Sequence, residues 1–141
     1  MLATTYELSK KLLELGLPWE TGDMQLQMNP FKKLLDCWDL DVGLAPKLDG
    51  HMPAWSLNGL HKVIPKHLDE FGSFSVKYSR IWDSYIVGYI DDARLWQKQF
   101  IKTDEFAATY EFVCWLLEND LIKKEDIEIM GNIHDNPELL K

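Results

Sequence analysis

Three histidines lie close together in the sequence and are the first residues that could bind a metal ion. His51, His61 and His67 are separated by gaps of ten and six residues. Imidazole nitrogens, completed by a carboxylate, bind zinc and iron in many proteins. Neighbours on one helix face lie three or four positions apart, so these gaps do not gather the rings on a helix. We therefore expect exposed histidines, no metal site and no cofactor; these three are the candidate ligands if a site exists.

An acidic stretch offers a different kind of metal ligand. It reads Asp39-Leu40-Asp41-Val42-Gly43, with Asp49 beyond it. Oxygens two residues apart can wrap around one calcium ion, but a calcium loop also needs a further acid before its glycine and a glutamate at its closing position. Both are missing here. The stretch is therefore predicted to be a solvated turn.

Neither cysteine has the surroundings of a nucleophile. Cys114 lies in FVCWLL, with no polar neighbour to lower its pKa, and the charge of the adjacent Asp36 raises the pKa of Cys37. Both are predicted to be buried free thiols rather than a disulfide. No serine lies in a Gly-x-Ser-x-Gly elbow, and no glycine loop suits a phosphate. We predict no catalytic residue.

One enzymatic alternative stays open. Asp91 and Asp92 are paired acids, and like charges side by side can displace a pKa. A small enzyme, metal-dependent or not, would use His51, His61 or His67 with one of these acids in a concave pocket.

Three segments carry the signals of helices that could position such groups. Thr4 and Glu7 have the spacing of a capping box, and Gly16 and Pro18 then end the first helix. Ser56 can cap a short second helix that Pro65 closes. The third begins at Thr103 or Asp104 and stops near Asn119, and its apolar positions recur at helical spacing: Phe106, Tyr110, Val113 and Leu117.

Between the second and third helices the apolar period changes to two, which is typical of strands. The first strand carries Phe74, Val76 and Tyr78, and the second carries Tyr85, Val87 and Tyr89. The break Trp82-Asp83-Ser84 predicts a hairpin between them. The segment Arg94 to Ile101 fits either a third strand or a helical turn.

These elements predict an α+β fold, in which an antiparallel β-hairpin or small sheet is covered by about three amphipathic helices. The expected unit is a small single domain over residues 1–122. Within it, residues 17–53 are rich in proline and glycine and are predicted to be irregular but anchored by aromatic side chains, with a helix of two turns at Phe31 to Trp38. Residues 123–141 are predicted to be a polar tail that is partly frayed.

Composition limits the function classes. The chain has 141 residues, 46% of them apolar and 27% charged, which is typical of a globular domain. Its formal net charge of -8 repels nucleic acids and anionic lipids. We expect no nucleic-acid partner and no membrane association, and the N-terminus lacks a signal-peptide pattern, so we expect a cytoplasmic protein.

Six tryptophans are the most unusual feature of the composition. Trp55 precedes the Ser56 cap, where an apolar residue staples onto the helix, so it is predicted to be packed in the core. Aromatic side chains that are exposed together concentrate binding energy at interfaces. The candidate interaction residues are Trp38, Trp82, Trp96, Tyr85 and Tyr89.

Three motifs resemble a family of small uncharacterised proteins of phages and prophages in gut bacteria. They are PAWSL at 53–57, the alternating strands that end at Tyr89, and EFVCWLLEND at 111–120. Thr21, Asp23 and Met24 add to the likeness, which spans residues 4 to 122. The resemblance implies a phage or mobile-element context and no known activity.

We favour a non-enzymatic interaction module that docks an unidentified protein partner or a second copy of itself. The His/Asp enzyme is one alternative. The other is an acidic mimic of nucleic acid, whose carboxylates would occupy a basic groove of another protein.

Overall fold

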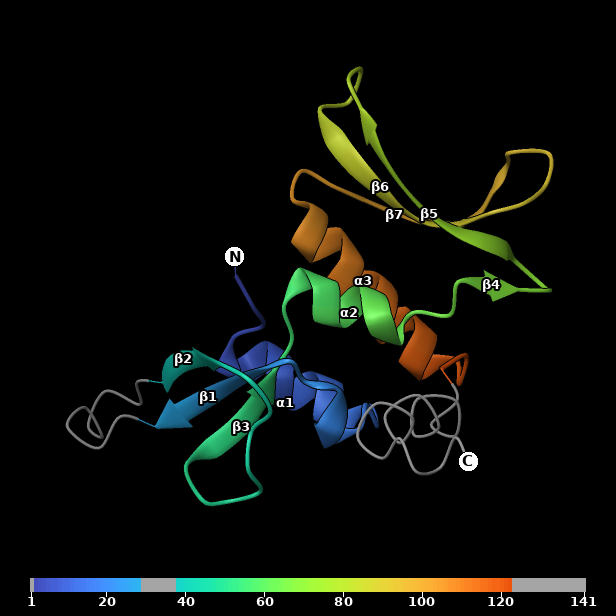
Figure 1. Ribbon diagram of the computed structural model, residues 1–141. Helices are drawn as coiled ribbons and strands as arrows, with labels where there is room; N and C mark the ends of the chain where they lie inside the picture. The colour runs from blue at the N-terminus through green and yellow to red at the C-terminus, as the bar shows by residue number, and fades with distance from the viewer. Residues whose placement is uncertain (1, 29–37, 123–141) are drawn as a thin grey trace, which may run out of the picture. The chain divides into compact units, whose positions relative to one another are not determined.

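The computed structural model describes residues 2–28 and 38–122 (Figure 1). They form three α-helices and two antiparallel sheets, which confirms the α+β prediction. The described chain divides into two compact units, an N-terminal unit within Met1–Gly59 and a C-terminal unit, Leu60–Ile122. The sequence had predicted one domain over this range. The predicted tail at 123–141 and residues 31–37 of the helix predicted at Phe31 to Trp38 lie outside the described residues, and Trp38 itself lies in a strand.

The N-terminal unit contains a helix, a short 3-10 turn and a three-stranded sheet in the order β2-β1-β3. Its elements are α1 (Tyr6–Glu14), the turn Trp19–Thr21, β1 (Met24–Met28), β2 (Trp38–Val42) and β3 (His51–Ala54). The prediction that residues 17–53 are irregular is therefore wrong for these strands. Their neighbours in the sheet lie far along the chain, and such pairing leaves no local turn signal.

Helix α1 begins one residue later than predicted. Thr5 is the N-cap, and its hydroxyl accepts a hydrogen bond from the backbone N–H of Leu8. Thr4 is buried instead: its Oγ1 accepts from the N–H of Trp55 at 3.0 Å and bonds to the Ser9 hydroxyl at 2.7 Å. Because these two bonds occupy the hydroxyl of Thr4, it does not cap the helix. The end of the helix follows the prediction, with Gly16 at a positive φ of 103°.

Helix α2 (Leu57–Val63) follows β3 directly. Ser56 caps it as predicted, because its hydroxyl accepts from the N–H of Gly59 at 3.1 Å. The carboxylate of Asp23 accepts two further hydrogen bonds from Ser56, one from its backbone N–H and one from its hydroxyl. The cap is thereby fastened to the residue just before β1.

The C-terminal unit contains a four-stranded antiparallel sheet, β4-β5-β6-β7, and one long helix. The predicted hairpin is confirmed, with Phe74 opposite Tyr89 and Tyr78 opposite Tyr85. The segment Arg94 to Ile101, which fits either a strand or a helical turn by its sequence, forms a strand from Trp96 onward. The elements are β4 (His67–Leu68), β5 (Gly72–Ser79), β6 (Ser84–Ile90), β7 (Trp96–Lys102) and α3 (Glu105–Glu118).

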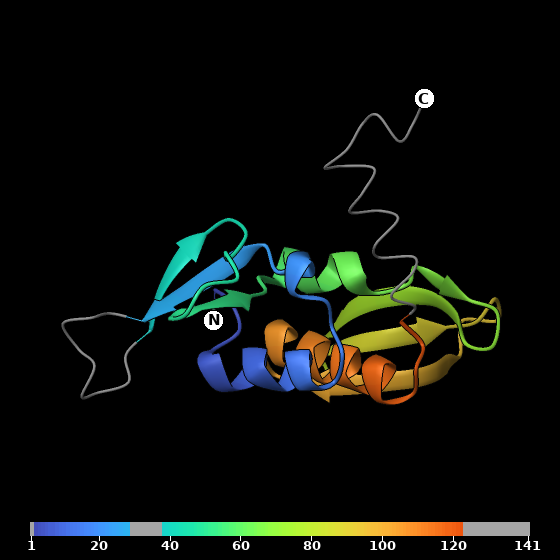
Figure 2. The same ribbon diagram turned by 90° about the horizontal axis from the view of Figure 1, so that it is seen from below.

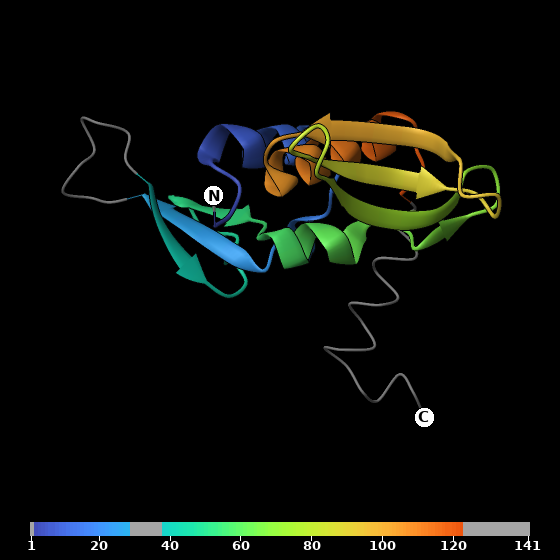
Figure 3. The same ribbon diagram turned by 90° about the horizontal axis from the view of Figure 1, so that it is seen from above.

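Helix α3 covers one face of this sheet, with the helix in front of the strands in Figure 2 and behind them in Figure 3. Asp104 caps it, as one of the two predicted residues. The centre of the packing is Phe112, which is fully buried. Its ring lies 5.7 Å from Phe74, 5.1 Å from Tyr89 and 6.0 Å from Phe100, between ring centroids.

Candidate functional site

Two of the candidate histidines are held by local partners. His51 in β3 has its Nδ1 3.3 Å from the carbonyl oxygen of Asp49. His67 in β4 has its Nδ1 3.2 Å from the Ser73 hydroxyl and its Nε2 3.3 Å from the Asp69 carboxylate. Within residues 2–28 and 38–122, no three His, Cys, Asp or Glu side chains are grouped so that they could hold a metal ion.

The third histidine belongs to the packing of the C-terminal unit. The ring of His61 contacts Phe74 edge-on, with centroids 5.6 Å apart. Its Nε2 is buried and has no hydrogen-bond partner among the described residues. Burial lowers the pKa of His61, against a smaller opposing effect of the Glu105 charge. Burial among aromatic rings therefore favours the neutral form of this imidazole.

Of the two acids in the enzymatic alternative, Asp91 is bound within a turn and Asp92 is exposed. Asp91 follows β6, and its carboxylate accepts from the N–H of Leu95 at 2.9 Å and from the side-chain amide of Gln97 at 2.7 Å. Both oxygens therefore hold the turn between β6 and β7. Asp92, the next residue, is exposed.

The cysteine prediction can be checked at one position. Cys114 is buried on α3, as expected, and its thiol is not part of a disulfide. Cys37 lies outside the described residues.

The candidate interaction residues of the C-terminal unit do not form one surface. Tyr89 is fully buried and donates a hydrogen bond to the Pro65 carbonyl at 2.7 Å, so its prediction as an interaction residue is wrong. Its burial also raises the pKa of the phenol. Trp82 is 59% exposed in the β5–β6 loop, whereas Trp96 pairs with Ile90 at the opposite end of β6. Tyr85 is half-buried against Tyr78.

Trp38 is the candidate that lies in a concave site. Its ring stacks on Tyr6, with centroids 4.8 Å apart and planes 17° from parallel. The pair borders a groove of about 390 Å³ between the chain entering α1, the first turn of α1, and strands β1 and β2. The groove is lined by Ala3, Thr4, Thr5, Tyr6, Glu7, Leu26, Trp38 and Leu40.

The strand register explains why apolar side chains collect on this side of the sheet. Paired residues share a face, and Leu26 lies between Leu40 and Met52. This face packs on a small core of Ala3, Leu26 and Ala54. The opposite face carries polar residues: Gln25, Gln27, Asp39, Asp41 and His51.

Asp39 to Val42 is therefore strand β2 and not the predicted solvated turn. The alternation of acid and apolar residues places the two carboxylates on the polar face and Leu40 in the groove.

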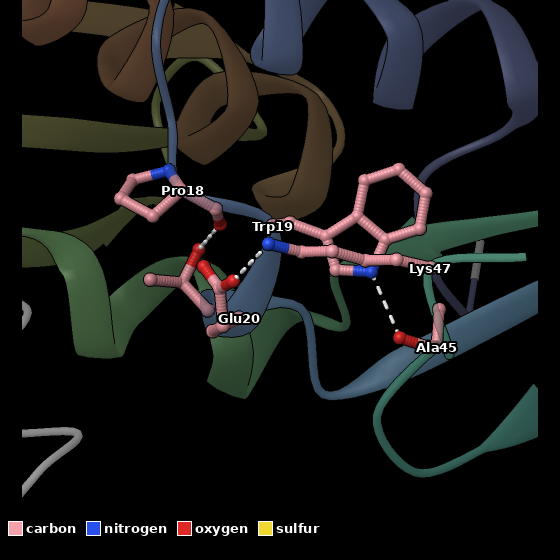
Figure 4. Close-up of polar contacts among 6 residues, drawn as sticks. Pro18, Trp19, Glu20, Ala45 and Lys47 are labelled. Atoms are coloured by element: carbon pink, nitrogen blue, oxygen red, sulfur yellow. Dashed lines mark hydrogen bonds and ion pairs between the residues drawn. The ribbon is translucent and has the colours of Figure 1, made fainter.

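The connection from β2 to β3 is anchored by the 3-10 turn (Figure 4). The indole N–H of Trp19 donates to the Ala45 carbonyl at 2.8 Å, and the Lys47 ammonium lies 2.7 Å from the Glu20 carboxylate. The hydrogen bond from Lys47 lowers the pKa of Glu20. The turn itself is tied down, because the hydroxyl of Thr21 accepts from the indole of Trp55 at 2.9 Å. These contacts hold the loop that leads from one edge of the sheet to the other, and Trp55 is buried as predicted.

Sequence reasoning found Trp38 and missed Tyr6 and Leu40. Tyr6 is the first residue of α1, where a single aromatic residue gives no periodic signal, and Leu40 lies in the stretch that the sequence predicts to be a turn. Chemically, the groove offers two stacked rings and aliphatic walls, and Glu7 supplies the one carboxylate among the described residues that line it. It suits binding of an apolar side chain rather than proton transfer.

No protein-family model, curated protein or solved structure matches this chain. Within its described part, none of the helices combines the length and the apolar character needed to cross a membrane.

Proposed function

We propose that this chain is a non-enzymatic interaction module whose N-terminal unit docks a protein partner. The observation that carries the proposal is the groove beside the stacked Tyr6–Trp38 pair, which remains partly open to solvent. Tryptophan and tyrosine are among the residue types that contribute most to binding at interfaces. PAWSL and the C-terminal helix resemble small proteins of phages and prophages, and this resemblance supports a phage or mobile-element origin.

The charge of the chain supports a protein partner with basic residues. The formal net charge is -8, and Glu7 lies in the groove itself. An acidic surface steers a basic partner and repels an acidic one. The apolar walls then provide the contact that holds the partner.

Selection of random peptides displayed on phage against the full chain tests this function. Peptides that bind in the groove should lose affinity for Trp38→Ala by about 30-fold, equivalent to the roughly 2 kcal/mol of a strong interface residue. The matched control is Trp82→Ala, which removes an exposed tryptophan of the other unit and should leave the affinity unchanged. Circular dichroism and an amide NMR spectrum serve to check that both variants fold. Selected peptides that bind Trp38→Ala as tightly as the unmodified chain would contradict the proposal.

A further inference from the structure

The four edges of the two sheets differ in how they are protected from pairing with another chain. Natural edges are blunted by proline, by charged side chains and lysine above all, by bulges or by very short strands. Strand β3 carries Pro53, β4 has two residues, and β7 carries Lys98 and Lys102 and a register irregularity opposite β6. Strand β2 has five residues, contains neither proline nor lysine, and pairs with β1 without a register shift. Of these four edge strands, β2 is the one that has none of the features named for the other three; the charged side chains that it carries are the aspartates Asp39 and Asp41.

The backbone of β2 presents hydrogen-bonding groups to this edge. The N–H of Gly43 bonds to the Asp23 carbonyl at 3.0 Å, and the N–H of Met28 bonds to the Gly50 carbonyl at 2.8 Å. Backbone groups alternate in direction along a strand, so the groups of Asp39 and Asp41 point to β1. Those of Leu40 therefore point away from β1, into the open edge.

The groups of Val42 are already engaged at the end of the strand. Its N–H bonds to the Asp41 carboxylate at 2.8 Å, and its carbonyl accepts from the Gln25 side chain at 3.4 Å. Among the described residues, the open donor and acceptor therefore centre on Leu40.

The side chains of β2 define what an added strand would have to carry. Leu40 and Val42 are 39% and 74% exposed on the groove side, and Asp39 and Asp41 are exposed on the other side. A strand added in register lies about 4.8 Å from β2, and its successive side chains alternate between these two faces. Apolar side chains fit beside Leu40 and the groove, and basic side chains fit beside the carboxylates.

We propose that the edge of β2 binds an extended segment of a partner protein in which basic residues alternate with apolar ones. The segment adds to the sheet as a fourth strand, with its backbone bonded to Leu40 and an apolar side chain directed to the groove. This rests on the proposed function and names the class of partner. Charge complementarity selects this occupant over a second copy of the same acidic strand, whose carboxylates would lie opposite Asp39 and Asp41.

A synthetic peptide of alternating lysine and valine, labelled for fluorescence anisotropy, tests the proposal on the full chain. Three control peptides keep most of its chemistry: the same residues in two blocks, glutamate in place of lysine, and N-methylation of the amides that face β2. We expect binding of the alternating peptide and at least tenfold weaker binding of each control. Equal binding of the blocked and alternating peptides would overturn the proposal, because charge alone would explain it.

Variants of the protein test the same contact from the other side. Leu40→Pro removes the outward N–H, and proline is tolerated at an edge strand when its missing donor faces solvent. Leu40→Ala is the matched control, because it trims the side chain and keeps the donor. We expect Leu40→Pro to lose at least tenfold in affinity and Leu40→Ala to lose a few-fold. If Leu40→Pro does not fold, the N-methylated peptide on the unmodified chain decides the question.

Further outcomes separate this inference from the proposed function. Displayed peptides that need Trp38 but bind Leu40→Pro normally would overturn the strand addition and leave the groove function standing. Failure of both the displayed and the alternating peptides would overturn both proposals. A dimer of the unmodified chain in sedimentation, lost in Leu40→Pro, would assign the edge to a second copy and overturn the basic partner.

Discussion

Replacing Phe112 by alanine tests the packing of the C-terminal unit most directly. The Phe112 ring is fully buried, and in addition to its contacts with the sheet it stacks on Trp115 of its own helix, with centroids 5.8 Å apart. Phe74, Tyr89 and Phe100 come from three different strands. The substitution therefore removes contacts between the helix and every long strand of the sheet.

The expected loss is about 4 kcal/mol in the free energy of unfolding. Truncation of a buried phenylalanine to alanine typically costs about 3–5 kcal/mol through lost burial and the remaining cavity. Phe112→Leu keeps most of the apolar volume and loses the ring geometry, so we expect a smaller loss of about 1–2 kcal/mol. The losses are measured by urea unfolding followed by circular dichroism, with the exposed Trp82→Ala as control, expected within about 0.5 kcal/mol of the unmodified chain.

Two results would refute this reasoning. A loss below about 1 kcal/mol for Phe112→Ala would mean that the ring is not the centre of the packing, since about 1 kcal/mol is the typical loss for a point mutation at any position. Equal losses for alanine and leucine would mean that the cavity left by alanine contributes nothing. The first result bears on the position of α3, and the second on how tightly the sheet closes around it.

Three further substitutions are informative. Tyr89→Phe leaves the Pro65 carbonyl without its donor, so we expect a loss of about 1–2 kcal/mol in urea unfolding and no change in peptide binding. Gly88→Ala places a Cβ against the backbone of Lys98 on the adjacent strand, so we expect a lower Tm by calorimetry. Burial lowers the pKa of His61 in the folded state, so the stability that depends on a neutral His61 is present above about pH 6.5 and is lost as the pH falls. The variant His61→Leu should therefore lose less stability between pH 7 and pH 5 than the unmodified chain, as measured by urea titrations.

The elements that the sequence predicted are those with local signals. Helix α3 has a cap and a continuous apolar face, and the β5–β6 hairpin has strict alternation on both sides of a short loop. Each signal is complete within about twenty residues, so no distant contact is needed to interpret it. Thr4 shows the limit, because its competing partners Ser9 and Trp55 are visible only in three dimensions.

The N-terminal sheet could not be predicted for a related reason. Strand β1 pairs with β3 across a connection that contains glycine and proline, and neither strand carries the β-branched residues that are typical of strands. The C-terminal hairpin gains its register from a turn, whereas β1 and β3 gain theirs from the Asp23–Ser56 contact and the loop anchored by Trp19. Contacts of that kind leave no periodic pattern in the sequence.

The same pattern that was predicted to be a turn now defines the candidate site. In Asp39-Leu40-Asp41-Val42, acids recur every second position, and both a calcium loop and an amphipathic strand share that period. The two differ in what lies on the apolar side. Leu40 is opposite buried Leu26 and beside the Tyr6–Trp38 pair, so the apolar face of the strand is fixed. A fixed apolar face determines the register of any strand that pairs with it.

A partner that slipped by one residue would place its basic side chains in the groove and its apolar ones beside the carboxylates. Shifting the alternating peptide by one position within a longer inert sequence should therefore leave its affinity unchanged, because it can realign, whereas interrupting the alternation at its centre should weaken binding.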